Sequence, residues 1–152
     1  LKPVDLAGVA RDVGDFLEVD AEDRGLALTL STPPGDCLVR GDRQLLAQLI
    51  SNLVQNALTH APGGGPIAVA VSGDHGRAVL TVSDHGPGIP EAERAKVLQR
   101  LYRLEQSRTT EGNGLGLSLV SAICDLHDAA LTLEDNAPGL TVRVVFPAPT
   151  TS

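Results

Sequence analysis

The sequence predicts an α+β domain in which helices cover one side of a mostly antiparallel or mixed β-sheet. The chain has 152 residues, about the size of a single globular domain. Apolar residues recur at three- and four-residue spacing in some segments, as in amphipathic helices, and alternate with polar residues in others, as in half-buried strands. The order of these segments is helix, two strands, helix, hairpin, polar segment, helix and hairpin. A doubly wound fold requires alternating strands and helices, so we disfavour it.

The first half of the chain has two predicted helices separated by two short strands. Asp5 can cap the first helix, and Asp42 can cap a longer one that ends at Pro62. Between these helices, residues 26–30 and 37–39 have the pattern of extended segments. The apolar residues of the longer helix cover one broad face, and its remaining surface is polar.

The second half of the chain predicts two hairpins and a third long helix. An alternating pattern interrupted by a glycine turn predicts a hairpin over 66–83. Further on, the patterns predict a short helix over 91–99, a long one over 114–126, and strands over 130–133 and 140–146. Residues 100–113 are polar with little periodicity, and we interpret them as mobile.

Composition excludes several classes of protein. Hydrophobic residues make up 42% of the chain, which is too apolar for a disordered tail. The 12 Lys and Arg against 19 Asp and Glu give a net charge of −7, which repels phosphate backbones, so we expect no nucleic-acid partner. No apolar run reaches the roughly 18 residues that span a bilayer, so we expect a soluble domain. Because the chain begins at Leu1 and contains no methionine, we expect a fragment of a longer protein.

The two cysteines do not indicate a metal site. Cys37 and Cys124 are far apart in the sequence and lack the spacing of zinc ligands or of a disulfide framework. We predict two buried thiols in a reducing compartment.

A polar stripe follows the longer predicted helix. Gln48, Asn52, Asn56 and His60 recur every four residues and therefore share one edge of that helix. The stripe is compatible with an ordinary solvated face. It is also compatible with a binding role, because two asparagines one turn apart can hold a hard cation or hydrogen-bond a phosphate.

Two glycine-containing segments are candidates for nucleotide contacts. Asp84 stands at the end of a predicted strand and begins the segment Asp84-His85-Gly86-Pro87-Gly88-Ile89, which on its own could be a simple turn. Gly112-Asn113-Gly114-Leu115-Gly116-Leu117 precedes a predicted helix, where exposed amides suit an anionic phosphate, although a hinge is the alternative. This second segment matches neither a P-loop nor a dinucleotide fingerprint.

Basic residues gather between these two segments. Five of the 12 Lys and Arg residues lie there: Arg94, Lys96, Arg100, Arg103 and Arg108. A positively charged lid over an anion is one interpretation, and a solvated charged helix is the other.

Taken together, these motifs resemble those of bacterial sensor histidine kinases. Asn52-Leu53-Val54-Gln55-Asn56-Ala57 resembles the N box, the segment from Asp84 to Ile89 the G1 box, and Gly112 to Leu117 the G2 box, in the same order and spacing. Arg100-Leu101-Tyr102-Arg103 resembles the F box, with Leu98 and Leu101 at the usual phenylalanine positions. The end of the family's last helix is similar to Cys124-Asp125-Leu126-His127.

The resemblance implies a catalytic, ATP-binding domain of the Bergerat type. Its expected fold is a two-layer α/β sandwich, with a mixed sheet covered on one side by about three helices and with a flexible ATP lid. The expected domain covers residues 5–147, preceded by the end of a linker at 1–4 and followed by a tail at 148–152. The implied cofactors are ATP and Mg²⁺.

The resemblance also implies roles for individual residues. Asp84 would accept the adenine amino group, Asn56 would ligate Mg²⁺ as the metal residue, and Asn52 would lie beside the phosphates. The implied catalytic residues are Asn52, Asn56 and Arg103. The implied nucleotide-binding residues are Asn52, Asn56, His60, Asp84, Gly86, Gly88, Ile89, Tyr102, Arg103, Arg108, Gly112, Gly114, Leu115, Gly116 and Leu117. A basic residue that is common in the family is replaced here by Thr59.

The reaction implied by the resemblance is phosphoryl transfer to a histidine outside this chain. Related ATPases have a water-activating Glu where this chain has Asn52, and an amide cannot accept the proton from water. The nucleophile in the family is a histidine on a preceding dimerization domain. We do not expect His127 to be that acceptor, although His127-Asp128 superficially resembles one.

The resemblance implies further partners and leaves alternatives open. The partners would be the dimerization and histidine-phosphotransfer domain of the same protein and the receiver domain of a response regulator. The fragment would be monomeric and cytoplasmic, and the parent kinase homodimeric and membrane-bound. The main alternative is a degenerate kinase domain that serves as a non-catalytic nucleotide-binding or interaction module, supported by Leu98, Leu101 and Thr59. A serine kinase or an ATPase of the same superfamily is disfavoured by Asn52.

Overall fold

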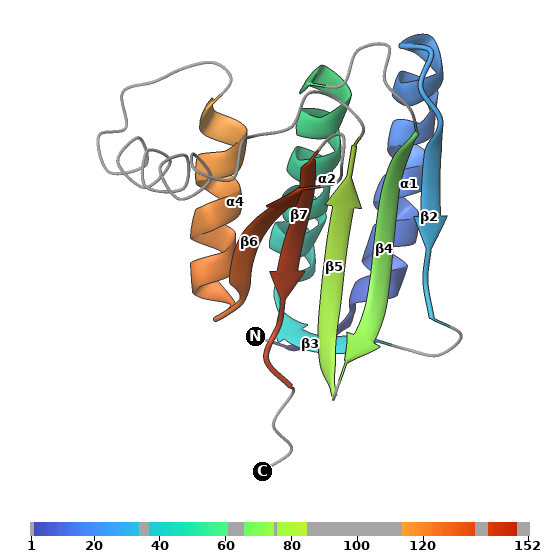
Figure 1. Ribbon diagram of the computed structural model, residues 1–152. Helices are drawn as coiled ribbons and strands as arrows, with labels where there is room; N and C mark the ends of the chain where they lie inside the picture. Colours follow the sequence, from blue (N-terminus) through green and yellow to red (C-terminus); the bar gives the residue numbers. More distant parts are fainter. Residues whose placement is uncertain are drawn as a thin grey trace.

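The computed structural model has two layers, a mixed β-sheet and a layer of helices packed against one of its sides (Figure 1). The structure describes residues 2–33, 37–60, 66–74, 76–84, 114–135 and 140–148. Its helices in this part of the chain are α1 (Leu6–Asp23), α2 (Arg43–His60) and α4 (Gly114–Leu126). The predicted α+β class and the three long helices are confirmed.

Within the described residues, the main sheet has five strands in the order β2-β4-β5-β7-β6. They are β2 (Leu28–Ser31), β4 (Ile67–Asp74), β5 (Arg77–Ser83), β6 (Ala130–Asp135) and β7 (Leu140–Val145). Strands β2 and β4 pair in parallel, and the three other pairings are antiparallel. The mixed sheet and both predicted hairpins are therefore confirmed.

A second, two-stranded sheet closes the lower end of the molecule. It pairs β1 (Lys2–Asp5) with β3 (Leu38–Gly41) in antiparallel register, with Val4 opposite Val39. Lys2 to Val4, which we expected to be the end of a linker, form part of β1. Four residues are too few to show a period, and their pairing partner lies more than 30 residues away along the chain.

The two predicted helix caps behave differently. At α2, the carboxylate of Asp42 accepts a hydrogen bond from the Leu45 N–H at 3.0 Å, as an N-cap should. At α1, Asp5 occupies the cap position, but its side chain makes no capping hydrogen bond to the backbone of the first turn. Its carboxylate instead accepts the Cys37 N–H at 3.0 Å and lies 3.6 Å from the Arg11 guanidinium. Asp5 therefore joins the start of α1 to the segment before β3.

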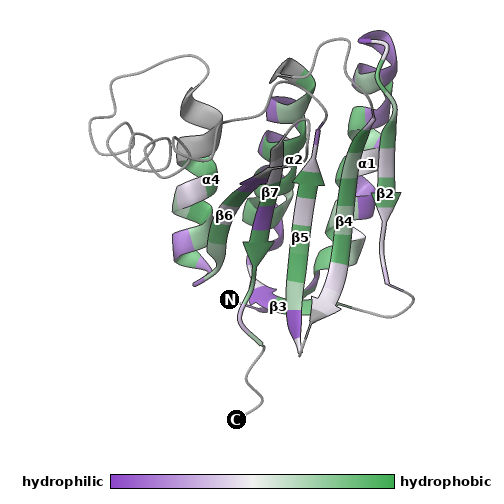
Figure 2. Cartoon of the chain, viewed as in Figure 1, coloured by the Kyte–Doolittle hydropathy of each residue, from purple (hydrophilic) through white to green (hydrophobic). Residues whose placement is uncertain are grey.

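The hydrophobic core lies between the helices and the sheet. The apolar face of α2 is almost completely excluded from solvent along its length, and Leu80 at the centre of β5 is also fully buried. Figure 2 shows mainly hydrophobic residues along β5 and the upper part of β4, and a mixture of hydrophobic and hydrophilic positions on α1 and α4. The fully buried large side chains are Phe146, Leu6, Leu46, Leu49, Ile50, Leu53, Leu58, Ile67, Leu80, Val9, Val39 and Val54.

Two expectations about composition can be compared with this fold. Cys37 and Cys124 are free and buried, as predicted. Within the described ranges, no helix is long and apolar enough to cross a membrane.

Candidate nucleotide-binding site

Three of the predicted site segments lie at the same end of the molecule. Strand β5 ends at Ser83 and is followed by Asp84, α2 has Asn52 and Asn56 in its second half, and α4 begins at Gly114. Figure 1 shows the end of β5, the end of α2 and the start of α4 at the same, upper end of the two layers. The fold therefore brings together segments that are about 30 residues apart in the sequence.

The two asparagines lie at the edge of the buried face of α2. Asn52 and Asn56 are partly exposed, whereas the neighbouring Leu53 and Ala57 are buried. A spacing of four residues puts both amides on the same side of the helix, about one turn apart. Two half-buried amide oxygens in this position have the hard-ligand chemistry that Mg²⁺ prefers. Gln48, earlier in the same stripe, is exposed.

Asp84 is a nearly buried carboxylate directly after a central strand. Only 7% of its surface is exposed. Just before it, the Ser83 hydroxyl lies 2.9 Å from the Thr141 hydroxyl, so β5 and β7 remain joined up to this point. A buried carboxylate loses much of its hydration and requires compensating interactions. Its burial at a strand end, where function often concentrates, makes Asp84 the strongest candidate for a ligand contact.

The start of α4 supplies a different kind of binding group. Gly114, Leu115, Gly116 and Leu117 form the first turn of α4, so the helix begins inside the glycine motif. The first four N–H groups of a helix have no partner within it, and they favour anions. The backbone of this segment is therefore suited to phosphate.

Several predicted site residues lie outside the described residues. They are Gly86, Gly88, Ile89, Tyr102, Arg103, Arg108 and Gly112, together with the expected lid over 100–113. The backbone of His60 ends α2, but its side chain is also outside the description, as are the side chains of Leu115 and Leu117.

His127 has a structural environment that sequence reasoning missed. It is 4% exposed, its Nδ1 lies 2.8 Å from the Ile123 carbonyl oxygen, and its Nε2 accepts the Asp42 N–H at 3.2 Å. Both ring nitrogens are therefore occupied, which argues against a role as phosphoryl acceptor. The two residues of the Asp42 contact are 85 positions apart. The one signal in the sequence for this contact is the position of a polar residue directly after an apolar helix.

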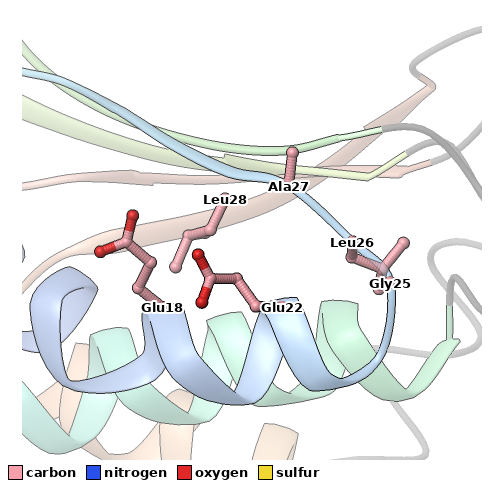
Figure 3. Close-up of a pocket in the computed structure, with 6 residues that line it drawn as sticks. All are labelled: Glu18, Glu22, Gly25, Leu26, Ala27 and Leu28. Atoms are coloured by element: carbon pink, nitrogen blue, oxygen red, sulfur yellow. The ribbon is translucent and has the colours of Figure 1, made fainter.

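Two other hollows lack the chemistry of a phosphate site. A hollow of about 440 Å³ lies between the end of α1 and the start of β2, where Glu18 and Glu22 extend from the helix toward Leu28 (Figure 3). Its carboxylates would repel phosphate. A second hollow of about 320 Å³ lies between α1 and α2 and includes the exposed Phe16. Neither includes Asp84, Asn52 or Asn56.

The fold indicates the class of the protein. A mixed five-stranded sheet backed by helices, as formed by the described residues, matches the structures of histidine kinase catalytic domains. The chain belongs to the family described as histidine kinase-, DNA gyrase B-, and HSP90-like ATPases, whose sequence profile matches residues 41–150. The resemblance in the sequence motifs is thereby confirmed.

Individual proteins that are similar to this chain are also sensor histidine kinases. The signal transduction histidine-protein kinase/phosphatase MprB of Mycobacterium sp. (strain KMS) is 45% identical over 102 residues, which are 66% of this chain and 20% of that protein. The solved structure of a mycobacterial sensor histidine kinase MprB matches with 30% identity and a TM-score of 0.76, covering 99% of both chains. A full-length ShkA structure in complex with AMPPNP matches with 26% identity and a TM-score of 0.80, covering all of this chain and 32% of that one. The chain thus matches about a fifth of the length of the curated MprB relative.

The buried thiol on α4 generates a prediction about alkaline stability. Burial, assisted by the charge of Asp125, raises the pKa of Cys124 from its usual 9.0 to about 12. As the pH rises, the thiol therefore ionises in the unfolded chain at a lower pH than in the folded protein. The stability that it contributes is present below about pH 9 and declines as the pH approaches the pKa of the folded state. When the pH is raised from about 7.5 to 10, the free energy of unfolding of the wild type should fall by roughly 1.4 kcal/mol more than that of Cys124→Ala. Urea unfolding at each pH measures this difference. Parallel pH dependences of the two proteins would contradict this assignment.

Proposed function

We propose that this domain binds Mg-ATP and transfers its γ-phosphoryl group to a histidine on another domain of the same protein, for relay to a response regulator. The observation that carries the proposal is the nearly buried Asp84, 7% exposed, directly after β5, whose end lies at the same end of the molecule as the end of α2 and the start of α4 (Figure 1). Membership in the kinase and ATPase family supports it. The AMPPNP complex of the similar ShkA supports an adenine nucleotide as the ligand.

The proposed site divides recognition among its segments. Asp84 accepts a hydrogen bond from the adenine amino group, because a carboxylate is a strong acceptor for an N–H donor. The free N–H groups of the first turn of α4 bind the phosphates. Asn56 is the proposed metal ligand, with Asn52 one turn away beside the phosphates. Magnesium, when bound, would neutralise part of the charge of the triphosphate.

The side chain at position 52 determines which nucleophile can react. An amide has no basic group to take a proton from water, so this residue does not activate hydrolysis. An imidazole nitrogen does not depend on such a base when it is neutral. In the proposed reaction it forms a bond to the γ-phosphorus, the bond to the leaving oxygen breaks, and ADP departs with that electron pair.

The proposed partners lie in the remainder of a longer protein and beyond it. Since this chain corresponds to about a fifth of a curated MprB, the acceptor histidine would be on a dimerization domain absent from the chain. The receiver domain of a response regulator would take the phosphoryl group from that histidine. The alternative of a non-catalytic module rests on Leu98, Leu101 and Thr59. The described residues add no observation in its favour.

The adenine contact predicts a specific loss of affinity. Asp84→Asn removes the charge of the acceptor but keeps its size, so the Kd for ATP should increase by about tenfold to a hundredfold, at 1.4 kcal/mol per decade. Isothermal titration calorimetry measures this change. The exposed Asp23→Asn on α1 is the matched control and should bind as the wild type does. Unchanged affinity in Asp84→Asn would remove Asp84 from the adenine site.

The metal contact predicts a loss of magnesium dependence. Asn56→Ala removes the amide oxygen, so ATP should bind this variant equally with Mg²⁺ and with EDTA. Asn56→Asp keeps an oxygen ligand and should retain the enhancement by Mg²⁺. Gln48→Ala, on the same helix, is the control. If Asn56→Ala shows the full magnesium enhancement in calorimetry, the metal ligand is another residue.

Reconstitution tests the proposed function directly. Alone, the chain should neither label itself from γ-³²P-ATP nor hydrolyse ATP appreciably, because the bound nucleotide has no aligned nucleophile. Mixed with the dimerization domain of its own parent protein, it should produce acid-labile phosphohistidine there, and Asn56→Ala should prevent this labelling. Rapid hydrolysis by the isolated chain would favour an ATPase, and ATP binding without any transfer would favour the non-catalytic module.

A further inference from the structure

We propose that His127 is a positioning residue for the nucleotide site, acting through α2. Its imidazole joins the end of α4 to the start of α2 and thereby sets the axial position of the helix that has Asn52 and Asn56. This inference rests on the proposed function, because it concerns the geometry of the same nucleotide site. His127 itself lies at the opposite end of both helices from that site (Figure 1).

The hydrogen bonds of His127 define its tautomer. The Asp42 N–H can only donate, so Nε2, 3.2 Å away, must be the unprotonated acceptor. The Ile123 carbonyl can only accept, so Nδ1, at 2.8 Å, must have the proton. The neutral Nδ1–H form alone satisfies both partners. The two hydrogen bonds fix the distance and direction between the end of α4 and the start of α2, which an apolar contact would not do.

The surroundings of the ring leave it little freedom to move. A Cβ atom at Gly41 would lie 2.6 Å from Cδ2 and 2.7 Å from Nε2 of His127, closer than atoms can approach. The absence of a side chain at the end of β3 is therefore what allows the imidazole to reach Asp42. The His127 ring also packs against Phe146 in a T-shaped arrangement, with ring centres 6.3 Å apart and planes at 85°. Phe146 is fully buried, so this side of the ring is fixed by the core.

The bond from His127 completes the N-terminal cap of α2. The Asp42 side chain accepts the Leu45 N–H and the Asp42 carbonyl accepts the Leu46 N–H at 2.9 Å, while its own N–H donates to His127. Every backbone group of the cap residue is thus satisfied. Removing the imidazole acceptor would leave the Asp42 N–H without this partner and release α2 from α4 at this end.

The rigidity of α2 transmits such a change to the site. Asn52 is ten residues after Asp42, about 15 Å along the helix at 1.5 Å per residue. An axial shift of a continuous helix is as large at Asn52 and Asn56 as at its first turn. The opposing helix α4 begins at Gly114, whose turn is the proposed phosphate contact. The His127 bond therefore controls the offset between the asparagine amides and the α4 amides.

Two substitutions at His127 separate positioning from general stability. His127→Leu removes both hydrogen bonds, whereas His127→Gln keeps an amide oxygen that can accept the Asp42 N–H. Leu126→Ala, at the neighbouring exposed position on the same helix end, is the matched control. Gly41→Ala leaves His127 present but displaces its ring. All variants are compared at a temperature where circular dichroism shows them folded.

Two measurements are made on each variant: hydrogen exchange of the Asp42 amide without nucleotide, and the Kd for Mg-ATP by calorimetry. His127→Leu and Gly41→Ala should lose protection at Asp42 and raise the Kd by about fivefold or more, the usual scale of coupling between separate sites. His127→Gln and Leu126→Ala should retain protection and affinity. Lost protection with unchanged affinity would overturn the positioning role alone. Absence of ATP binding by the wild type, with Asp42 protected, would overturn the proposed function and the positioning role together.

Discussion

The burial of one broad apolar face of α2 is the constraint on which the other parts of this structure depend. Four consecutive core positions of α2 are fully buried, which fixes the rotation of the helix about its axis: Leu49, Ile50, Leu53 and Val54. Burial of each such side chain contributes about 1.5–3 kcal/mol, more than a surface amide could contribute by any single hydrogen bond. The core therefore determines the orientation of α2, and Asn52 and Asn56 lie at its edge as a consequence. Their arrangement does not require a ligand to form it.

The two ends of the helical layer use polar groups differently. At the lower end, polar groups are satisfied within the protein: Asp42 caps α2, His127 accepts the Asp42 N–H, and Asp5 accepts the Cys37 N–H. At the upper end, the half-buried amides of α2 and the first turn of α4 offer donors and acceptors near a nearly buried carboxylate. Polar groups that support the fold and polar groups suited to a ligand are thus separated by the length of α2.

Sequence reasoning succeeded where a signal was local and failed where it depended on distant partners. The helices and hairpins have enough residues for a period to appear, and Asp42 was correctly predicted as a cap because its partner, Leu45, is three residues away. Asp5 has the same local pattern, but Cys37, 32 residues later, offers its N–H instead. Strand β1 and the His127 contact were missed for the same reason. Of the candidate site, the asparagine edge and Asp84 could be predicted from motifs, whereas the burial of Asp84 could not.

In the proposed function, the chemistry of the site depends on Asn52, an amide at the position where a water-activating base would be needed. Asn52 cannot take a proton from water, so this residue does not direct the bound triphosphate toward hydrolysis. The only buried histidine in the described part of the chain, His127, has both nitrogens in hydrogen bonds that support α2, so the side chain most similar to an acceptor is committed to structure. This environment of His127 agrees with the proposed separation of phosphoryl donor from acceptor. Under the proposed function, the nucleophile comes from another domain, and its approach determines when transfer occurs.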